Sequence, residues 1–555
     1  MIKYPAIFAL GLLFAGVSSD VASAQPQSPD TLSAKFDKML SAQFKSDEPG
    51  ATVLVARKGR VVYTRAFGLA NVELYVPMHV ASVFKIGSIT KQFTAVAILQ
   101  LAEQRKLSLK DDITRFIPDY PMGGRKITIE HLLTHTSGIW SYTSMPDVVK
   151  RGAMDFTPAE MIDHFKNQPM RFDPGTKWEY SNSNYVLLGA IIEKISGKTY
   201  GAYLEQNIFK PAGMTRSLYA SDIRLVTNRA DGYSMTEEGI VNAAYLSMTQ
   251  PYAAGSILST VEDLFKWNQA LQSGKLIKRE TLKKAWTRYK LADGTETRYG
   301  YGWRMGYIQE SRSLWHGGWI NGFITMTMYL PDEDVFVAVL TNRDPNSPED
   351  VVARLAAVAI GRPYEYTAIP LAPNAAAGYE GVYEDGTGQM RVITAAEGRV
   401  YFQSGYAPRI PAQPYQPDRF FFENDVFLTA TFERTARGNV DRLVTRSRER
   451  IDVWKKTAKP IPSPDGITLD ESALAPIIGE YEVNPEFMFS VTREGGRLYI
   501  QATGQERLEM FAESETKFFL KVNDAQLEFV KDDQGAIRKA VISQSGRTTD
   551  AKKVR

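Results

Sequence analysis

The chain has 555 residues, which at about 150 residues per domain amounts to three or four domains, or to a large catalytic unit with smaller ones attached. Hydrophobic residues make up 44% and charged residues 23% of the chain, which excludes a predominantly disordered, collagen-like or coiled-coil protein. The formal net charge of +3 is too small for the broad positive field that nucleic-acid binding needs, so we expect a neutral or small partner and no nucleic acid.

The N-terminal segment predicts a signal peptide. Lys3 precedes an apolar run from Ala6 to Val17, shorter than the about 20 residues of a membrane-spanning helix, and Ala22-Ser23-Ala24 is a small-x-small cleavage site. We therefore expect residues 1–24 to be removed and the protein to be exported, periplasmic or secreted. The alternative, an uncleaved anchor, needs a longer apolar stretch. No later segment is a continuous apolar span, so we expect no membrane span in the mature chain.

The next segments predict a hairpin and then a buried helix. Residues 50–68 alternate around Lys58-Gly59, which indicates two antiparallel strands joined by a tight turn. Residues 88–107 carry apolar side chains on nearly every side of a helix, so this helix belongs in the interior of the domain.

Two more helices and a second hairpin complete the first part of the chain. The helices are expected at 184–195, ended by Ser196-Gly197, and at 260–272, opened by a capping box of Ser259 and Glu262. Residues 322–340 predict a β-hairpin around Pro331-Asp332. Strands at both ends with helices between them favour an α/β sandwich whose antiparallel sheet pairs the two ends, within a domain at 25–364.

After residue 364 the sequence becomes strand-rich and repeats itself. Residues 379–383 align with 477–481 at an offset of 98, and the same offset aligns 398–401 with 496–499 and Phe420-Phe421 with Phe518-Phe519. We therefore expect two copies of one module, at 377–458 and 471–555. Short strands separated by glycine turns favour up-and-down β-barrels, with proline-bearing linkers before each copy.

Ser88 and Lys91 form an S-x-x-K motif at the start of the predicted 88–107 helix. The i, i+3 spacing puts both side chains on one face, so a neutral lysine amine can take the proton of the serine hydroxyl. The helix N-terminus adds free N–H groups and a positive dipole end, which favour negative charge beside Ser88. By itself the motif is more typical of a serine cap followed by a solvated lysine, but the buried character of the helix favours the catalytic interpretation.

Three further motifs follow in order: LLTHTSGI at 132–139, Tyr180-x-Asn182 before a helix, and His316-Gly317-Gly318 in a glycine-rich strand. Together with S-x-x-K, they resemble the penicillin-recognising serine hydrolases, which include class C β-lactamases, D-alanyl-D-alanine carboxypeptidases, D-aminopeptidases and related esterases. The resemblance covers residues 30–362. It implies a serine β-lactamase-like catalytic domain, an α+β sandwich of an antiparallel sheet and helices, here followed by two all-β barrel-like domains.

The resemblance also implies a role for each motif residue. Ser88 would be the nucleophile that forms an acyl-enzyme, Lys91 its proton acceptor, and Tyr180 a second acid/base that passes the proton to the leaving group. Asn182 would orient Lys91 or the substrate amide. The oxyanion hole would combine the N–H groups of Ser88 and Trp319.

The third motif departs from the family pattern. Lys-Thr-Gly is usual in β-lactamases and carboxypeptidases, whereas this chain has His316, Gly317 and Gly318. The glycines let an acyl chain approach the strand backbone closely. A histidine is mostly neutral near pH 7, so it does not supply the permanent cation that suits a substrate carboxylate. Penicillin turnover is therefore less favoured than peptide or ester hydrolysis, and the His-x-Gly variants with two appended barrels resemble D-aminopeptidases.

Metal and cofactor chemistry has little support in the sequence. The chain has no cysteine, and Glu130, His131 and His135 have helical metal spacing without an HExxH pattern, so a structural role at a helix end is the expectation. Ser196-Gly197-Lys198-Thr199 looks like the end of a phosphate loop but lacks its first glycine and follows a helix. We expect no metal and no cofactor.

These observations predict an exported serine hydrolase that forms an acyl-enzyme through Ser88 and cleaves peptide or amide bonds, with D-residue-containing or unusual linear peptides favoured by analogy. The alternatives are a carboxylesterase on small acyl esters, a β-lactamase or penicillin-binding protein, and a non-enzyme that binds cell-wall fragments or lipid through a vestigial site. The expected partner is a small peptide or ester. The sequence does not determine an oligomeric state.

Overall fold

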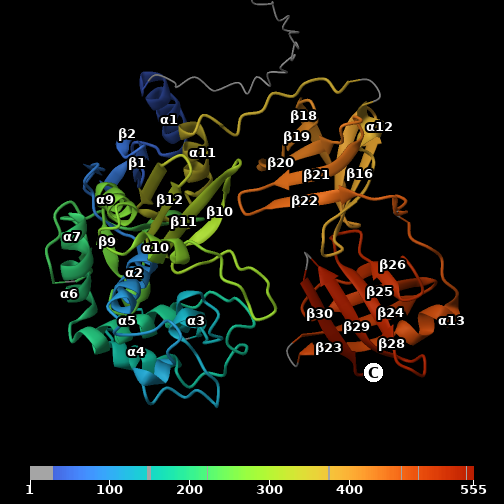
Figure 1. Ribbon diagram of the computed structural model, residues 1–555, viewed down its shortest axis with the longest axis horizontal. Helices are drawn as coiled ribbons and strands as arrows, with labels where there is room; N and C mark the ends of the chain where they lie inside the picture. The colour runs from blue at the N-terminus through green and yellow to red at the C-terminus, as the bar shows by residue number, and fades with distance from the viewer. Residues whose placement is uncertain are drawn as a thin grey trace, which may run out of the picture.

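The computed structural model describes residues 29–146, 152–221, 223–372, 375–463, 465–484, 487–544 and 547–555. The expected signal peptide at 1–24 lies outside these ranges. Figure 1 shows a mixed α/β unit formed by the first two thirds of the chain and two β-barrels, one after the other, formed by the last third.

A six-stranded antiparallel sheet organises the α/β unit, with strand order β10-β11-β12-β13-β1-β2. Its strands are β1 (Ala51–Arg57), β2 (Arg60–Phe67), β10 (Arg304–Ile308), β11 (Ser311–Ile320), β12 (Phe323–Leu330) and β13 (Val335–Thr341). Strand β1 pairs with β13 from Ala51 opposite Thr341 to Arg57 opposite Val335. The sheet therefore joins the two ends of the unit, as the sequence predicted.

Both faces of this sheet are buried, and alternate residues of one strand supply two separate cores. Val53 and Val55 of β1 pack with α1 (Pro29–Gln43) and α11 (Glu349–Ala359) on one face. Leu54 and Ala56 belong to the larger core on the other face, which contains most of the remaining helices. The α/β sandwich is thus three layers deep, with the large helical layer on one side of the sheet (Figure 1).

The helices that follow Ser88 and Tyr180 lie in the large layer. Helix α2 (Thr90–Glu103) follows the 3₁₀ turn η1 (Gly87–Ile89), and α5 (Asn182–Ser196) ends at Gly197, which has φ +68°. The layer also contains α9 (Val261–Gln272) and α10 (Arg279–Ala285). Its smaller elements are η2 (Ile113–Arg115), α3 (Ile129–Leu133), η3 (Tyr142–Ser144), α4 (Pro158–Phe165), α6 (Tyr200–Leu204), η4 (Glu205–Phe209), α7 (Lys210–Ala212), α8 (Tyr252–Gly255), β3 (Leu69–Asn71), β4 (Val76–Pro77), β5 (Phe84–Lys85), β6 (Leu218–Tyr219), β7 (Tyr233–Thr236), β8 (Gly239–Asn242), β9 (Ile257–Ser259) and β14 (Arg343–Asp344).

Two predicted helix starts are wrong by one or two residues. The predicted capping box of Ser259 and Glu262 is shifted by one, because Thr260 caps α9 by accepting a hydrogen bond from the Asp263 N–H. Ser259 instead ends strand β9. Helix α5 begins at Asn182 rather than at residue 184, so the Tyr180-x-Asn182 motif runs directly into it.

The last third of the chain forms two closed eight-stranded barrels, which confirms the predicted all-β modules. The short helix α12 (Ala375–Tyr379) precedes the first barrel, and α13 (Glu471–Leu474) with η5 (Ala475–Ile477) precedes the second. The first barrel consists of β15 (Gly381–Glu384), β16 (Met390–Ala396), β17 (Arg399–Ser404), β18 (Ile410–Gln416), β19 (Arg419–Phe422), β20 (Asp425–Arg434), β21 (Val440–Arg446) and β22 (Ile451–Lys456). The second consists of β23 (Gly479–Asn484), β24 (Phe487–Glu494), β25 (Arg497–Ala502), β26 (Leu508–Ala512), β27 (Lys517–Phe519), β28 (Gln526–Lys531), β29 (Ile537–Gln544) and β30 (Arg547–Lys553).

The repeat in the sequence corresponds to a repeat of contacts. Tyr383 in the first barrel donates a hydrogen bond to the carbonyl of Tyr379 at 2.7 Å, and Tyr481 in the second donates to the carbonyl of Ile477 at 2.7 Å. The same two tyrosines stand opposite Lys456 and Lys553 where each barrel closes. Each barrel interior is packed with apolar side chains, many of them aromatic.

The first barrel docks on the edge of the catalytic sheet. The loop between β21 and β22 brings the Arg448 carbonyl within 2.7 Å of the Tyr307 N–H on edge strand β10. The Arg448 guanidinium pairs with Asp350 at 2.7 Å, and Glu449 of the same loop pairs with Arg298. The two barrels contact one another through the stacked rings of Tyr406 and Phe519, 3.6 Å apart. Within the described ranges, no helix combines the length and the apolar character that a membrane crossing requires.

Candidate active site

Ser88 lies in the 3₁₀ turn η1, one turn before helix α2, at the centre of the α/β unit. Its side chain is partly exposed, whereas Gly87 and Ile89 on either side are buried. Gly87 has φ +49°, and a Cβ there would lie 3.0 Å from the Trp319 nitrogen of β11, so a side chain would push the turn away from the strand. The sequence predicted a helix from residue 88; the tighter turn instead presents Ser88 at the helix entrance.

Lys91 is fully buried, and its amine makes three contacts. Nζ lies 2.7 Å from Oδ1 of Asn182, 2.8 Å from the carbonyl of Ala254 and 3.0 Å from Oγ of Ser88. Burial, together with the charge of Arg304, lowers the pKa of Lys91 well below its usual range. A neutral amine has two N–H groups for the two carbonyl oxygens, so its lone pair points at the Ser88 hydroxyl. An amine in this position can act as a base toward the hydroxyl.

Tyr180 completes this group from the segment before α5. The amine of Lys91 lies 4.9 Å from the centre of the Tyr180 ring. Burial raises the pKa of Tyr180 to about 12, although a hydrogen bond with Ser88 and the charge of Arg304 act in the opposite direction. Tyr180 is therefore a protonated phenol near neutral pH and can donate a proton to a departing amine.

His135 holds Tyr180 in place from both neighbouring peptide units. Its carbonyl accepts a hydrogen bond from the Glu179 N–H at 3.0 Å, its Nδ1 accepts one from the Ser181 N–H at 3.1 Å, and its ring lies 4.3 Å from the Tyr180 ring. The residue has φ +59°, an uncommon conformation for a non-glycine residue. Burial above all, together with the charge of Arg304, lowers the pKa of His135 well below the usual range, so the ring is neutral.

His316 lies in β11, buried rather than in a solvated loop. Its Nδ1 lies 2.6 Å from the Gly317 carbonyl, which can only accept, so Nδ1 bears the proton and Nε2 accepts from the Tyr299 hydroxyl at 2.9 Å. Burial and the charge of Arg304 lower the pKa of His316 well below its usual range. The expectation of a neutral histidine in the third motif agrees with this environment.

The glycine-rich strand closes the site opposite Ser88. A Cβ on Gly318 would lie 2.0 Å from the Ile86 carbonyl, so only glycine allows β11 to run this close to the η1 turn. The Trp319 ring is 70% exposed. Strands β11 and β12 meet at the pair Ile320–Phe323, and alternation in an antiparallel ladder turns the Trp319 N–H away from β12, toward the Ser88 turn.

Arg304 supplies a permanent cation that the sequence analysis did not identify. It lies on β10 opposite Trp315, half-buried, with its guanidinium carbon 5.7 Å from the ring centres of both Trp178 and Tyr180. Among the residues the structure describes, no carboxylate lies within ion-pair distance of it. The change from Lys to His in the third motif therefore does not leave this site without a fixed positive charge.

The residues considered for metal binding have other partners. Glu130 binds Lys110 at 2.8 Å and the Tyr301 hydroxyl at 2.5 Å, and His131 caps the start of α3 through its Nδ1. In the described part of the chain, no group of three or more metal-binding side chains comes together. His135 is turned away from this pair and belongs to the Tyr180 environment.

The structure brings together Ser88, Lys91, Tyr180, Asn182 and the strand of the His-Gly-Gly motif, all of which the sequence singled out. It adds Arg304 and Tyr299, and it gives His135 a contact that the helical spacing did not suggest. These residues lie in unrelated parts of the sequence, and no short spacing marks Arg304 or Tyr299. For His135, the only signal in the sequence was the motif LLTHTSG, which places this residue in a turn.

Two family models match the chain, one over the α/β unit and one over the second barrel. The beta-lactamase family model matches residues 35–361, and a domain of unknown function, DUF3471, matches residues 463–553, which include the second barrel. Penicillin-binding protein 4* of Bacillus subtilis (strain 168) is 26% identical over 520 residues, 90% of this chain and 94% of that protein.

Two relatives carry names that refer to D-amino acid chemistry. The D-aminopeptidase of Gluconobacter oxydans (strain 621H) is 26% identical over 343 residues, 60% of this chain and 64% of that protein. The structure of a D-stereospecific amidohydrolase from Streptomyces sp. superimposes with a TM-score of 0.51 and 26% identity, covering 58% of this chain and 98% of that chain. Because the family match extends over more than half of the sequence and includes the entire Ser88 site, this chain belongs to the beta-lactamase family and is a serine hydrolase.

Proposed function

We propose that the protein is an exported amide hydrolase that forms an acyl-enzyme through Ser88 and acts on D-residue-containing or otherwise unusual linear peptides. The observation that carries this proposal is the environment of Lys91, whose two N–H groups are engaged by carbonyl oxygens while its third position faces the Ser88 hydroxyl at 3.0 Å. The names of the D-aminopeptidase and the D-stereospecific amidohydrolase support the substrate class by analogy. The proposed units are the signal peptide at 1–24, the catalytic domain at 25–364 and the modules at 377–458 and 471–555.

In the acylation step, Ser88 Oγ attacks the carbonyl carbon of the substrate while its proton moves to Lys91. The carbonyl oxygen becomes an oxyanion, for which the N–H groups of Ser88 and Trp319 are the proposed donors. Tyr180 gives its proton to the leaving amine as the C–N bond of the substrate breaks, and it regains a proton from Lys91. Asn182 keeps the Lys91 amine in position throughout the reaction.

In the deacylation step, water attacks the Ser88 ester. The same amine takes a proton from the water, and the proton returns to Ser88 Oγ as the acid product leaves. His316 stays neutral and holds the Tyr299 hydroxyl, so it shapes the site without supplying charge. Arg304 is the proposed partner for an anionic group on the substrate, because it is half-buried beside the site and has no carboxylate partner in the described residues.

Fluorophosphonate labelling followed by peptide mass mapping tests the nucleophile. We expect wild type to be labelled on Ser88, and Ser88→Ala to lose labelling and on the order of a thousandfold or more in kcat while still folding. Ser137→Ala is the matched control, because this nearby hydroxyl binds Asn184 at 2.7 Å and has no contact with Lys91. Labelling of Ser88→Ala at the wild-type rate would refute the assignment.

The substrate class needs a separate measurement. A panel of L- and D-amino acid amides and short peptides, one aryl ester and one penicillin, assayed by kcat/KM, compares the proposed amidase with the esterase and β-lactamase alternatives. A higher value for D-amides than for their L-counterparts supports the proposal. Turnover confined to the ester would leave Ser88 as nucleophile and replace the amidase by an esterase.

A further inference from the structure

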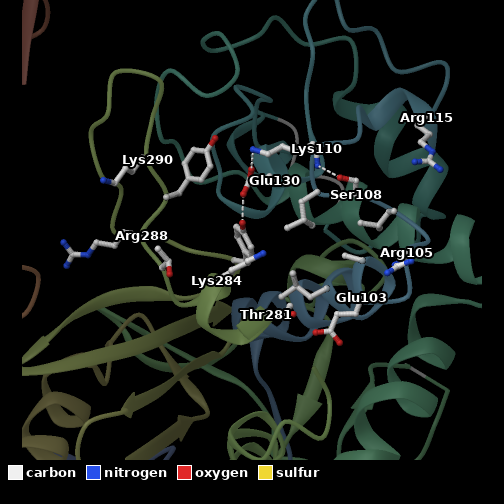
Figure 2. Close-up of a pocket in the computed structure, with 17 residues that line it drawn as sticks. Glu103, Arg105, Ser108, Lys110, Arg115, Glu130, Thr281, Lys284, Arg288 and Lys290 are labelled. Atoms are coloured by element: carbon white, nitrogen blue, oxygen red, sulfur yellow. Dashed lines mark hydrogen bonds and ion pairs between the residues drawn. The ribbon is translucent and has the colours of Figure 1, made fainter. Parts of the chain in front are cut away.

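A large cavity lies away from Ser88, at the opposite end of helix α2. It has a volume of about 870 Å³ and is enclosed by the C-terminal end of α2, the segment 107–110, helix α10 and the segment 287–290 (Figure 2). Helix α2 rises about 1.5 Å per residue, so the cavity begins roughly 20 Å from the nucleophile. We call it the basic groove.

The floor of the basic groove is apolar and recessed. Leu99, Leu107 and Tyr301 line it and are only 2%, 5% and 7% exposed, while Ala102 and Leu109 are partly buried. Because the first three residues are almost completely covered, Ala102 and Leu109 are the apolar lining residues that a ligand could contact.

The walls of the groove carry six basic side chains and two acidic ones. The basic residues are Arg105, Lys110, Arg115, Lys284, Arg288 and Lys290, and the acidic ones are Glu103 and Glu130. Figure 2 shows Lys110, Glu130 and Lys284 near the middle of the groove and Arg115, Arg288 and Lys290 toward its rim.

Half of these cations are neutralised within the protein. Lys110 pairs with Glu130 at 2.8 Å, Arg115 with Asp111 at 2.6 Å and Lys290 with Glu296 at 3.4 Å. The Glu103 carboxylate accepts the Lys278 N–H at 2.9 Å and, among the described residues, forms no ion pair, so its negative charge remains in the groove.

Three cations are left over. Among the described residues, Arg105, Lys284 and Arg288 have no carboxylate within ion-pair distance. With the unpaired carboxylate of Glu103 counted against them, the groove keeps a net charge of about +2 in a chain whose net charge is only +3.

Arg105 has an unfavourable backbone conformation at the end of α2. It is the residue after the C-cap of α2 and has φ +58°, a position at which glycine is the usual residue. Its N–H still closes the helix by donating to the Ala102 carbonyl at 2.9 Å. An arginine in this conformation directs a cation to the groove entrance that glycine could not provide.

From the apolar lining and the three cations without an ion-pair partner, we propose that the basic groove binds a single-chain anionic amphiphile, with its hydrocarbon chain on Ala102 and Leu109 and its phosphate or carboxylate head on Arg105 and Lys284. This inference is independent of the proposed function, because no lining residue of the groove belongs to the Ser88 site. It also differs from the sequence-based alternative of a binding protein with a vestigial site, since the proposed ligand lies outside the catalytic site.

The test is calorimetric binding of dodecyl phosphate below its critical micelle concentration to the full-length protein. We expect one molecule to bind per chain, with Lys284→Glu weakening the affinity at least tenfold. The matched control is Lys283→Glu, an equal charge change on the neighbouring exposed residue of α10 that does not line the groove. Arg105→Asn is a second variant, because asparagine tolerates the left-handed backbone while removing the cation.

Two further ligands test the contributions of the anionic head and of the hydrocarbon chain separately. Inorganic phosphate and dodecyl maltoside are each expected to bind at least tenfold more weakly than dodecyl phosphate. Equal binding of inorganic phosphate, equal binding of the maltoside, or equal losses in Lys283→Glu and Lys284→Glu would each overturn the proposal. A loss in Arg304→Gln without one in Lys284→Glu would place the anion in the catalytic site and overturn it as well.

Discussion

The charge of Arg304 offers a quantitative test of how the Ser88 base is tuned. The Lys91 amine and the Arg304 guanidinium lie 4.9 Å and 5.7 Å from the same point, the Tyr180 ring centre, so they are at most about 11 Å apart. Two unit charges at about 11 Å interact by roughly 1.5 kcal/mol at an effective dielectric of about 20. Water around the half-buried Arg304 screens part of this interaction, so roughly 1 kcal/mol should favour protonation of Lys91 once the charge of Arg304 is removed.

The direction of the expected pKa change follows because Lys91 acts as a base in its neutral form. The nearby cation disfavours the protonated amine and lowers the pKa of Lys91, so Arg304→Gln raises that pKa. At a given acidic pH more of the amine is then protonated and inactive. The acidic limb of the profile of kcat/KM against pH therefore moves to higher pH.

The assay uses a neutral aryl ester, so that loss of a substrate–Arg304 contact does not contribute. Arg312→Gln is the matched control, since Arg312 lies on the same hairpin but pairs with Asp332 at 2.7 Å at its far end. An unchanged acidic limb in folded Arg304→Gln, or an equal shift in Arg312→Gln, would show that Arg304 does not set the basicity of Lys91.

Three other changes test the strand and the barrel contact. Gly318→Ala puts a Cβ 2.0 Å from the Ile86 carbonyl, so we expect a fall in melting temperature together with loss of fluorophosphonate labelling; a normal melting curve with full labelling would contradict the close approach. Glu449→Ala breaks the ion pair with Arg298 next to the edge strand, and if the first barrel gates the site, the ratio of kcat/KM for a peptide to that for an aryl ester should change; an unchanged ratio argues against gating. His316→Lys introduces a charge where burial disfavours one. Penicillin acylation should therefore rise relative to ester acylation only if the new lysine stays charged. Stopped-flow measurements of acylation with both substrates test this.

The sequence by itself determined the features that depend on local spacing. Ser88 and Lys91 are three residues apart, so a helical entrance was sufficient to bring them to one face. The 98-residue offset between the barrel modules was visible because Tyr383 and Tyr481 perform the same closing contact in each. The hairpins around Lys58-Gly59 and Pro331-Asp332 were likewise encoded in alternation and turn residues, and β1 and β13 follow from them.

Other features were not accessible from local patterns, because their causes lie in segments distant along the chain. The depressed pKa of Lys91 is caused by burial and by the charge of Arg304, neither of which the S-x-x-K spacing contains. The one-residue error at the start of α9 arose because Ser259 and Thr260 are both good caps, and only the pairing of β9 with β5 fixed Ser259 in a strand.

Arg304 and His135 show the same limit at the active site. Arg304 reaches it because β10 adds to the edge of the sheet beside the strand of the His-Gly-Gly motif, a neighbour relation set by topology. His135 had helical metal spacing with His131, but its left-handed backbone turns the ring onto Tyr180, and that conformation is held by hydrogen bonds to residues 179 and 181. Sequence spacing thus determined which chemistry was present, whereas tertiary packing decided which charges surround it, because burial and through-space distance, not position in the chain, set those pKa values.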